Sequence, residues 1–459
     1  MHPMRSLHAR QRRAIRRGIA RSDAYAFFNM LTGEDTLDRV EALLPAHRER
    51  RFTPTETLAM FMAQALSADR SCQKAVNDFT AKRAAAGLPT GSTRTGGYCR
   101  ARARLPCRMV STLVRQTGLS LAAQIPSTWR WRSRPVRLVD GTTLAMPDSP
   151  DNQCAYPQAR TQQPGLGFPV CRLAAVICLS SGAVLDAAVG CYRGKGGDEP
   201  SLLRQMLGCL DPGDVLVADA LYGSYFLLCE LRRRGIDGVF EQYGARRCST
   251  DFRTGHRLGS RDHLVDLVKP ATRPDWMSQA QYDRAPGTLT IRELRAGGKT
   301  LITTLLCAQT TPKAEIQALY QRRWHIELDL RNLKSTLGMD RLTCKTPAMV
   351  VKEIWVYLLA YNLIRRLVAH AASRAHVQPR QLSFKHSLQL WLAWHHHELA
   401  ADPCRCAVLL TLIAQKRVGN RPGRIEPRAV KRRANPFPLL MQPRSVARET
   451  VVSAWRTGR

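Results

Sequence analysis

Acidic residues are scarce in this sequence. Its 459 residues include 36 Asp and Glu against 70 Lys and Arg, which gives a formal net charge of +34. Such an imbalance favours a polyanionic partner, because phosphates are attracted over a long range and release their counterions on contact. We therefore expect nucleic acid as the partner. A solvated basic surface, ribosomal binding and membrane-surface binding are the alternatives.

The sequence also lacks a cysteine framework. Its 14 Cys are scattered without a CxxC pair, and only Cys404 and Cys406 lie close together, so a zinc site is poorly supported. Free thiols in a reducing cytosol are the simplest account. The run His395–His397 could bind a metal, but we expect surface histidines. Residues Lys195–Asp198 lack the full spacing of a P-loop and are predicted to form a glycine-rich turn.

Long apolar runs are missing as well. Residues 1–21 hold seven Arg and no long apolar stretch, unlike a secretory signal. The most apolar segment, residues 354–364, is too short to cross a membrane and is interrupted by Asn362. Because hydrophobic residues still make up 44% of the chain, it can bury a sizeable core. We expect a cytoplasmic protein with no membrane partner.

A chain of 459 residues is longer than one core normally organises. Three parts are predicted: a helical, basic DNA-binding domain at 1–130, an α/β domain at 131–372, and a helical, basic region at 373–459. The last 44 residues, Lys416–Arg459, hold 12 basic and two acidic residues, a net charge of 12 − 2 = +10. No internal repeat is apparent.

The N-terminal domain is predicted to contain three helical segments: residues 54–66 after a capping Thr53, residues 71–85, and the Arg-rich residues 98–104 after a break at 87–91. This order is typical of a helix-turn-helix DNA reader, with Arg100, Arg102 and Arg104 on its contact face. A helical bundle whose basic residues face solvent is an equal alternative.

The α/β domain is predicted from the order of its elements: strands at 136–140, 171–178 and 184–189, a helix at 199–210, a strand at 214–219, a helix at 227–234 and a strand at 236–240. This is the order of a ribonuclease-H-like core, a mixed sheet with helices on its faces. Residues 245–310 interrupt it as a β-rich insertion that includes a hairpin at 288–306.

Two aspartates, Asp140 and Asp219, each end an apolar run of the α/β domain. Hydrolysis and transfer of a phosphodiester use two divalent metal ions roughly 3.5–4 Å apart. Mg²⁺ prefers hard carboxylate oxygens, and the strand ends of an α/β sheet can bring such groups together from distant segments. Each aspartate taken alone has an ordinary alternative as a turn or helix-capping residue.

A third acid lies in the predicted helix that contains residues 320–334. At roughly 100° per residue, four residues share one face of that helix: Tyr320, Arg323, Glu327 and Lys334. One acid beside two bases suits a metal ligand next to phosphate clamps. The alternative is a solvated face with pairing between residues four apart.

Taken together, these stretches resemble the Asp-Asp-Glu (DDE) transposases of bacterial insertion sequences, in the subgroup with a Tyr-Arg-Glu-Lys signature. The resemblance runs from about Phe52 to Leu440 and includes these ordered matches: Tyr98–Pro106, Asp140–Leu144, Pro164–Pro169, Gly213–Asp219, Tyr320–Asp340 and Ala360–Leu363. One departure is that Ala220 and Leu221 follow Asp219, where the family commonly has arginine. This change would remove a local DNA or structural contact without affecting the ligand.

The resemblance implies roles for individual residues. Asp140, Asp219 and Glu327 would be catalytic residues that bind Mg²⁺, for which Mn²⁺ would substitute. Contacts to DNA phosphates at the element ends are implied for the three other residues of the signature: Tyr320, Arg323 and Lys334. Trp276 is the candidate for a tryptophan that stacks on a flipped base in related enzymes, and ordinary packing is its alternative.

The sequence therefore predicts a transposase, a homodimer on double-stranded DNA in the bacterial cytoplasm at the nucleoid. It would bind terminal inverted repeats, cleave there with water, and join the freed 3′-hydroxyl to target DNA. A nuclease of the same fold that no longer integrates is the alternative enzyme. A DNA-binding repressor with a defunct core is the alternative outside enzymes, and the three retained carboxylates argue against it.

Overall fold

The computed structural model describes residues 44, 51–85, 87–242, 250–395, 403–419 and 440–456. The expectations for residues 1–21, for the His395–His397 run and for the Cys404–Cys406 pair lie outside the side chains that it describes.

Three N-terminal helices form as predicted: α4 (Pro54–Leu66), α5 (Cys72–Ala85) and α6 (Gly96–Arg104). The first turn of α4 is fixed by Thr53, whose hydroxyl accepts a hydrogen bond from the Glu56 backbone N–H at 3.3 Å. Gly87 and Gly91 have φ values of 65° and 64°, the left-handed conformation that turns the chain between α5 and α6.

One sheet of nine strands forms the centre of the described fold, in the order β3-β2-β1-β4-β5-β9-β8-β7-β6. Its first half holds β1 (Val136–Ala145), β2 (Val170–Cys178), β3 (Val184–Cys191), β4 (Val215–Ala218) and β5 (Asp237–Glu241). β1, β4 and β5 run parallel, whereas β2 and β3 are antiparallel to their neighbours. The predicted mixed sheet of an α/β fold is therefore present.

The β-rich segment extends the same sheet. It contains β6 (His256–Gly259), β7 (Asp262–Val268), β8 (Thr288–Ala296) and β9 (Lys299–Thr303). The predicted hairpin is β8–β9, turned by Gly297 and Gly298 at positive φ. Because β9 pairs antiparallel with β5, the segment is continuous with the main sheet through backbone hydrogen bonds.

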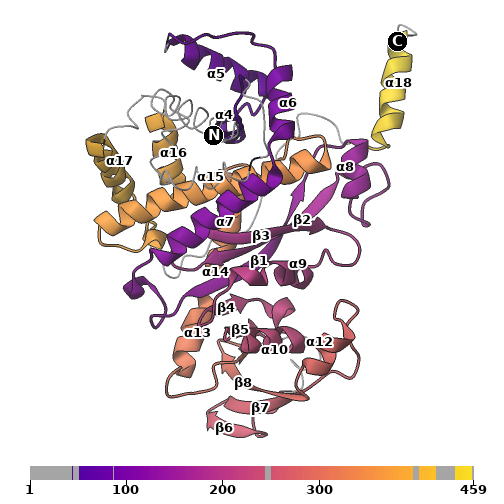
Figure 1. The fold of residues 1–459 in the computed structure, drawn as a ribbon. Helices are drawn as coiled ribbons and strands as arrows, with labels where there is room; N and C mark the ends of the chain where they lie inside the picture. The colour runs from indigo at the N-terminus through magenta and orange to yellow at the C-terminus, as the bar shows by residue number, and fades with distance from the viewer. Residues whose placement is uncertain are drawn as a thin grey trace, which may run out of the picture.

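Helices cover both faces of the first half of the sheet (Figure 1). One layer contains α7 (Cys107–Ala123) and α15 (Pro347–Arg374), and the other contains α9 (Glu199–Met206) and α10 (Tyr225–Arg233). Adjacent β1 residues face opposite layers, Leu138 towards the first and Val139 towards the second. α7 precedes the domain boundary predicted near residue 130, but its apolar face, including Leu113 and Val114, packs into the core of the α/β part.

α15 is the central helix of its layer. It is long and apolar enough to span a membrane by composition, but 78% of that window is buried inside the protein, as expected of a core helix. Asn362 does not interrupt it, because the amide of Asn362 is hydrogen-bonded to Val114 of α7 and to Val184 of β3. Lys352 of α15 donates to the last carbonyls of α6, those of Arg102 at 2.8 Å and Ala103 at 3.0 Å.

The long helix predicted to resume near Pro312 is interrupted by one turn and then continues into a π-helical segment. α13 (Lys313–Gln321) ends in a turn at Arg322 and Arg323, α14 (Trp324–Arg331) follows, and residues Asn332–Thr336 form a π-helical turn. The remaining described α-helices are α8 (Pro150–Ala155), α12 (Gln279–Arg284), α16 (Phe384–His395), α17 (Pro403–Gln415) and α18 (Arg444–Arg456). Short 3₁₀ turns lie at Ser127–Trp129, Leu207–Cys209, Ala220–Tyr222 and Pro379–Gln381.

Candidate active site

The two predicted aspartates lie at the same level of the sheet: Asp140 is on β1, and Asp219 directly follows the parallel strand β4. In the register of β1 and β4 the last pair is Leu138 with Val217. Two residues further along each strand, Asp140 is level with Asp219, and neighbouring strands are about 4.8 Å apart. Asp140 does not end its strand as predicted, since β1 continues to Ala145 against β2. β4, in contrast, does end at this level. Beyond Leu138, β1 is no longer paired with β4, which leaves an open sheet edge beside Asp140.

The side chain of Arg323 connects Glu327 to Asp140. One Nη atom of Arg323 lies 2.9 Å from Oε1 of Glu327, and the other lies 3.5 Å from Oδ2 of Asp140. A single guanidinium thus bridges β1 and α14. Across the described part of the chain, no three His, Cys, Asp or Glu side chains are arranged as a ready-made metal cluster. The guanidinium group of Arg323 therefore lies between the carboxylates of Asp140 and Glu327.

The electrostatics of Asp140 favour a bound cation. Burial raises the pKa of Asp140 to about 6, and the negative charges of Glu199 and Asp219 raise it as well. The Gly141 backbone N–H, which donates to Oδ1 at 2.8 Å, and Arg323 oppose this shift. Buried carboxylates that repel one another are hard oxygen donors in need of positive charge. The residues present therefore fit a divalent metal ion that prefers oxygen ligands.

Glu199 is a further acid of the site that the sequence reading missed. It lies in the first turn of α9, capped by Asp198, and its carboxyl group packs over Gly141, where a Cβ atom would lie 2.4 Å from Cδ of Glu199. The Tyr222 hydroxyl donates to its Oε2 at 3.2 Å. The only available signal was an acid at a helix start after a glycine-rich turn, which does not reveal a neighbour 58 residues away (199 − 141 = 58).

Lys334 also contacts β1. Its Nζ donates to the hydroxyl of Thr142 at 3.1 Å and to the carbonyl of Thr143 at 3.0 Å, next to Asp140. Tyr320 is different: it is buried, and its hydroxyl donates to Glu241 at 3.3 Å at the end of β5. The four residues of the signature do not share one continuous helix face, because the chain between them contains a turn and a π-helical segment.

The prediction for the Arg-rich helix was wrong in part. Arg100 and Arg104 are exposed on α6, but Arg102 is only 8% exposed. Its guanidinium lies 4.7 Å from the ring centroid of Phe61 and donates to Gln64 at 3.1 Å. Two residues along an α-helix turn about 200°, so Arg102 must face away from the other two. It packs inside the N-terminal helices.

Trp276 lies in the loop before α12 and is 45% exposed. Arg204 of α9 stacks over its ring at 4.0 Å, and Phe226 packs against it edge-on at 6.3 Å. The neighbouring Asp275 pairs with Lys195 at 2.8 Å, which connects this loop to the glycine-rich turn before α9. The indole is thus partly packed and partly open to solvent.

Comparison with known proteins identifies the family. The sequence model described as "Transposase DDE domain" matches residues 131–363, half of the chain and the part that contains all three predicted carboxylates. The chain belongs to the DDE transposase family. It is therefore a DNA transposase, an enzyme of DNA cleavage and strand transfer, and neither the nuclease nor the repressor alternative is favoured.

Two curated relatives from Escherichia coli (strain K12) agree with this assignment. "Transposase InsG for insertion sequence element IS4" is 28% identical over 320 residues, which cover 67% of this chain and 70% of the relative. "Putative transposase InsZ" is 29% identical over 136 residues, 29% of this chain and 44% of the relative. Membership of the DDE family implies a divalent metal cofactor.

Proposed function

We propose that this transposase acts on insertion-sequence ends, with Asp140, Asp219 and Glu327 as ligands of Mg²⁺, for which Mn²⁺ substitutes. The observation that carries the proposal is the parallel register of β1 and β4, which aligns the two aspartates, with Arg323 joining Asp140 to Glu327. When bound, the metal ions activate the attacking oxygen and stabilise the leaving oxygen.

The reaction consists of two displacements at phosphorus. Water attacks the phosphodiester at the element end, an O–P bond forms, and the P–O3′ bond breaks to free a 3′-hydroxyl. That hydroxyl attacks a target phosphodiester, and a target 3′-hydroxyl leaves. Arg323 offers a two-pronged contact to phosphate, and Lys334 offers a point charge. Tyr320 is not a nucleophile in this scheme; its hydroxyl is held by Glu241.

We assign the core to the ribonuclease-H-like type on its strand order, β3-β2-β1-β4-β5, with only β1, β4 and β5 parallel. The helices α4 to α6 are the proposed DNA-reading part within residues 1–130, and α7 is assigned to the core. Residues 131–372 contain the catalytic part, with the insertion at about 245–310. Residues 373–459 add a basic C-terminal region.

The partners in this proposal are double-stranded terminal inverted repeats and target DNA, bound by a homodimer in the cytoplasm. The net charge of +34 supports a phosphate-rich partner. Arg100 and Arg104, exposed on one side of α6, are the proposed contacts to the element ends. Trp276, with one part of its ring open to solvent, is the proposed stacking residue for an unpaired base.

The test is cleavage of duplex DNA that carries the sequence flanking the gene, with Mg²⁺ and a target plasmid present. Alanine at Asp140, Asp219 or Glu327 should abolish cleavage while DNA binding persists. Asp283→Ala, which removes an exposed acid of α12, is the matched control and should cleave normally. Wild-type cleavage by Glu327→Ala would remove that residue from the ligand set.

A further inference from the structure

The helix that carries Glu327 has little support from its own chain. α14 contains only eight residues, and it is preceded by a turn and followed by a π-helical turn. Helices this short are not stable by themselves in water. The orientation of α14, and with it the direction of Glu327, must therefore be fixed by contacts to neighbouring elements.

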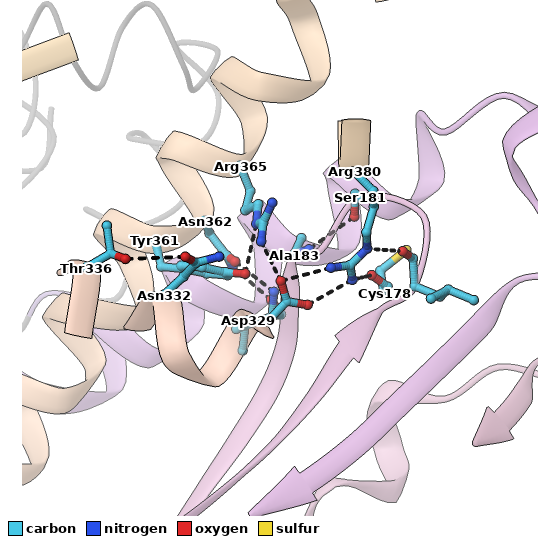
Figure 2. Close-up of polar contacts among 12 residues, drawn as sticks. Cys178, Ser181, Ala183, Asp329, Asn332, Thr336, Tyr361, Asn362, Arg365 and Arg380 are labelled. Carbon is cyan, nitrogen blue, oxygen red and sulfur yellow. Dashed lines mark hydrogen bonds and ion pairs between the residues drawn. The ribbon is translucent and has the colours of Figure 1, made fainter. Parts of the chain in front are cut away.

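Asp329 supplies such a contact on the side opposite to Glu327. The two residues are two positions apart, about 200° around the helix, and the Glu327 side chain is 36% exposed whereas that of Asp329 is fully buried. The Asp329 carboxylate accepts hydrogen bonds from Arg365 of α15 and from both terminal nitrogens of Arg380, at 2.9 and 2.8 Å (Figure 2).

Both arginines are themselves anchored. Nε of Arg365 donates to the Tyr361 hydroxyl at 2.8 Å. Nε of Arg380 donates to the carbonyl of Leu179 at 2.6 Å, just after β2. β2 pairs along its whole length with β1, the strand that carries Asp140. A chain of direct contacts therefore runs from α14 through Arg380 to the partner strand of Asp140.

The charges around Asp329 make this contact specific. Among the described residues, it is the acid that ion-pairs with the two buried guanidinium groups. Arg322 adds a further positive charge near Arg380. Without the carboxylate, Arg365 and Arg380 would remain buried as like charges with no counter-ion.

We infer that Asp329, held by Arg365 and Arg380, is a positioning residue that sets the distance between Glu327 and Asp140. It touches neither DNA nor metal in this role and acts only through α14. The inference rests on the proposed function, because it needs Glu327 to be a metal ligand. Outer contacts of this kind typically change metal affinity by roughly 10–100-fold when they are removed.

The test uses the full chain and two readouts. Mn²⁺ binding without DNA is measured by electron paramagnetic resonance, and cleavage of end DNA is measured at saturating DNA. Asp329→Asn keeps the size of the side chain and removes its charge. We expect Mn²⁺ affinity to fall roughly 10–100-fold, kcat to fall and recover at high Mn²⁺, and the KM for DNA to stay unchanged.

The matched control is Asp214→Asn. Asp214 forms a similarly buried ion pair with Arg137 at 2.9 Å, near the start of β1 and three residues before Asp140. It should lose thermal stability without losing Mn²⁺ affinity. If Asp329→Asn does not fold, Arg380→Gln replaces it, because this change leaves Asp329 paired with Arg365 and breaks only the link to β2; the same shift in Mn²⁺ affinity is expected.

Normal Mn²⁺ affinity in folded Asp329→Asn or Arg380→Gln protein, or equal losses in these variants and the control, would overturn the inference. Glu327→Gln is measured alongside them. If Glu327→Gln weakens Mn²⁺ binding and Asp329→Asn does not, the inference alone fails. If Glu327→Gln has no effect on Mn²⁺ binding, the proposed metal site fails, and the positioning role fails with it.

Discussion

Gly141 has no side chain to keep Glu199 away from β1. The carboxyl group of Glu199 occupies the space where a Cβ atom of residue 141 would lie, directly after Asp140. A side chain at residue 141 would therefore require the Glu199 side chain to shift, for a reason that lies in the neighbour and not in the backbone dihedral angles of residue 141.

Gly141→Ala should therefore reduce DNA cleavage strongly while the protein stays folded. The added methyl group must displace Glu199 or β1, and a displacement of about 1 Å in an active site can lower the rate on the order of 10²-fold. Gly208→Ala is the control, since a Cβ there meets nothing within 4 Å. Equal cleavage rates for the two variants would show that Glu199 can move aside without consequence.

The raised pKa of Asp140 predicts a pH-dependent stability. Its pKa of about 6 in the folded protein lies above the ordinary aspartate value of 3.8, so between these two pH values the folded state binds more protons than the unfolded state. The stabilisation is fully present below about pH 4 and is lost as the pH rises through about 6. The metal-free protein should thus melt at a lower temperature at pH 7.5 than at pH 5.

Asp140→Asn should raise the melting temperature of the metal-free protein at pH 7.5, because the amide is neutral beside Glu199 and Asp219. The gain should shrink below pH 6, where Asp140 itself becomes protonated. Thermal unfolding in a chelator at both pH values checks this. A variant that is less stable than the wild type at pH 7.5 would mean that Asp140 is not under repulsion.

At the scale of single elements, local signals predicted structure well. The Thr53 cap, the glycines between α5 and α6 and the β8–β9 hairpin all act within a few residues, so the sequence contains the whole cause. The positions of the aspartates could be predicted from local signals too, since Asp219 directly follows an apolar strand and Asp140 follows the apolar start of β1. Glu199 and the Asp329 network could not, because their partners come from distant segments.

The predicted side-chain directions of Tyr320 and Arg102 were wrong, each for a definite reason. A strict 100° rotation places Tyr320 on the face of Glu327, but the turn at Arg322 and Arg323 begins a new helix. Arg102 was placed on a surface by composition, although its spacing from Arg100 and Arg104 turns it to the opposite side of α6. For Arg102 the spacing was more informative than the chemical type, whereas for Tyr320 the spacing itself gave the wrong face because the helix is not continuous.

For α6, we predict that arginine variants will separate into two classes. Arg100→Ala and Arg104→Ala should weaken binding to end DNA, each lowering the salt slope by about one, without changing stability. Arg102→Ala should lower the free energy of unfolding by about 1–3 kcal/mol, because Gln64 loses a buried partner. Salt-dependent binding and chemical denaturation of the three proteins decide this. A salt slope altered mainly by Arg102→Ala would reverse the assignment.

Lys334→Ala should impair the assembly of the cleaved-end complex and leave Mn²⁺ affinity nearly intact, because an ammonium group cannot bind the metal. In the free protein its contact to Thr142 is part-buried and its contact to Thr143 is exposed, so their loss should change stability by about 1 kcal/mol or less. Gel-shift and melting measurements on the same variant check both parts. Normal assembly by a slightly destabilised protein would reduce Lys334 to a structural contact.

At the scale of the whole molecule, the continuous sheet makes the β-rich segment an integral part of the fold. β9 pairs with β5 along the edge of the parallel strands, and Gln242 after β5 continues the contact with Thr300. Replacing residues 250–311 by a short linker should therefore expose the β5 edge, lower the melting temperature and cause aggregation. A monomeric deletion variant as stable as the wild type would show that the segment is an independent module.

Lys352 holds the end of α6 against the helix at the centre of the α/β part. If α6 reads the DNA, the base pairs that it contacts and the bond that the carboxylates cut are a constant number of ångströms apart. The enzyme would then measure as well as recognise: one base pair added between the recognised sequence and the terminal nucleotide would move the cut by one base pair into the element, and the inserted copy would lose its own end.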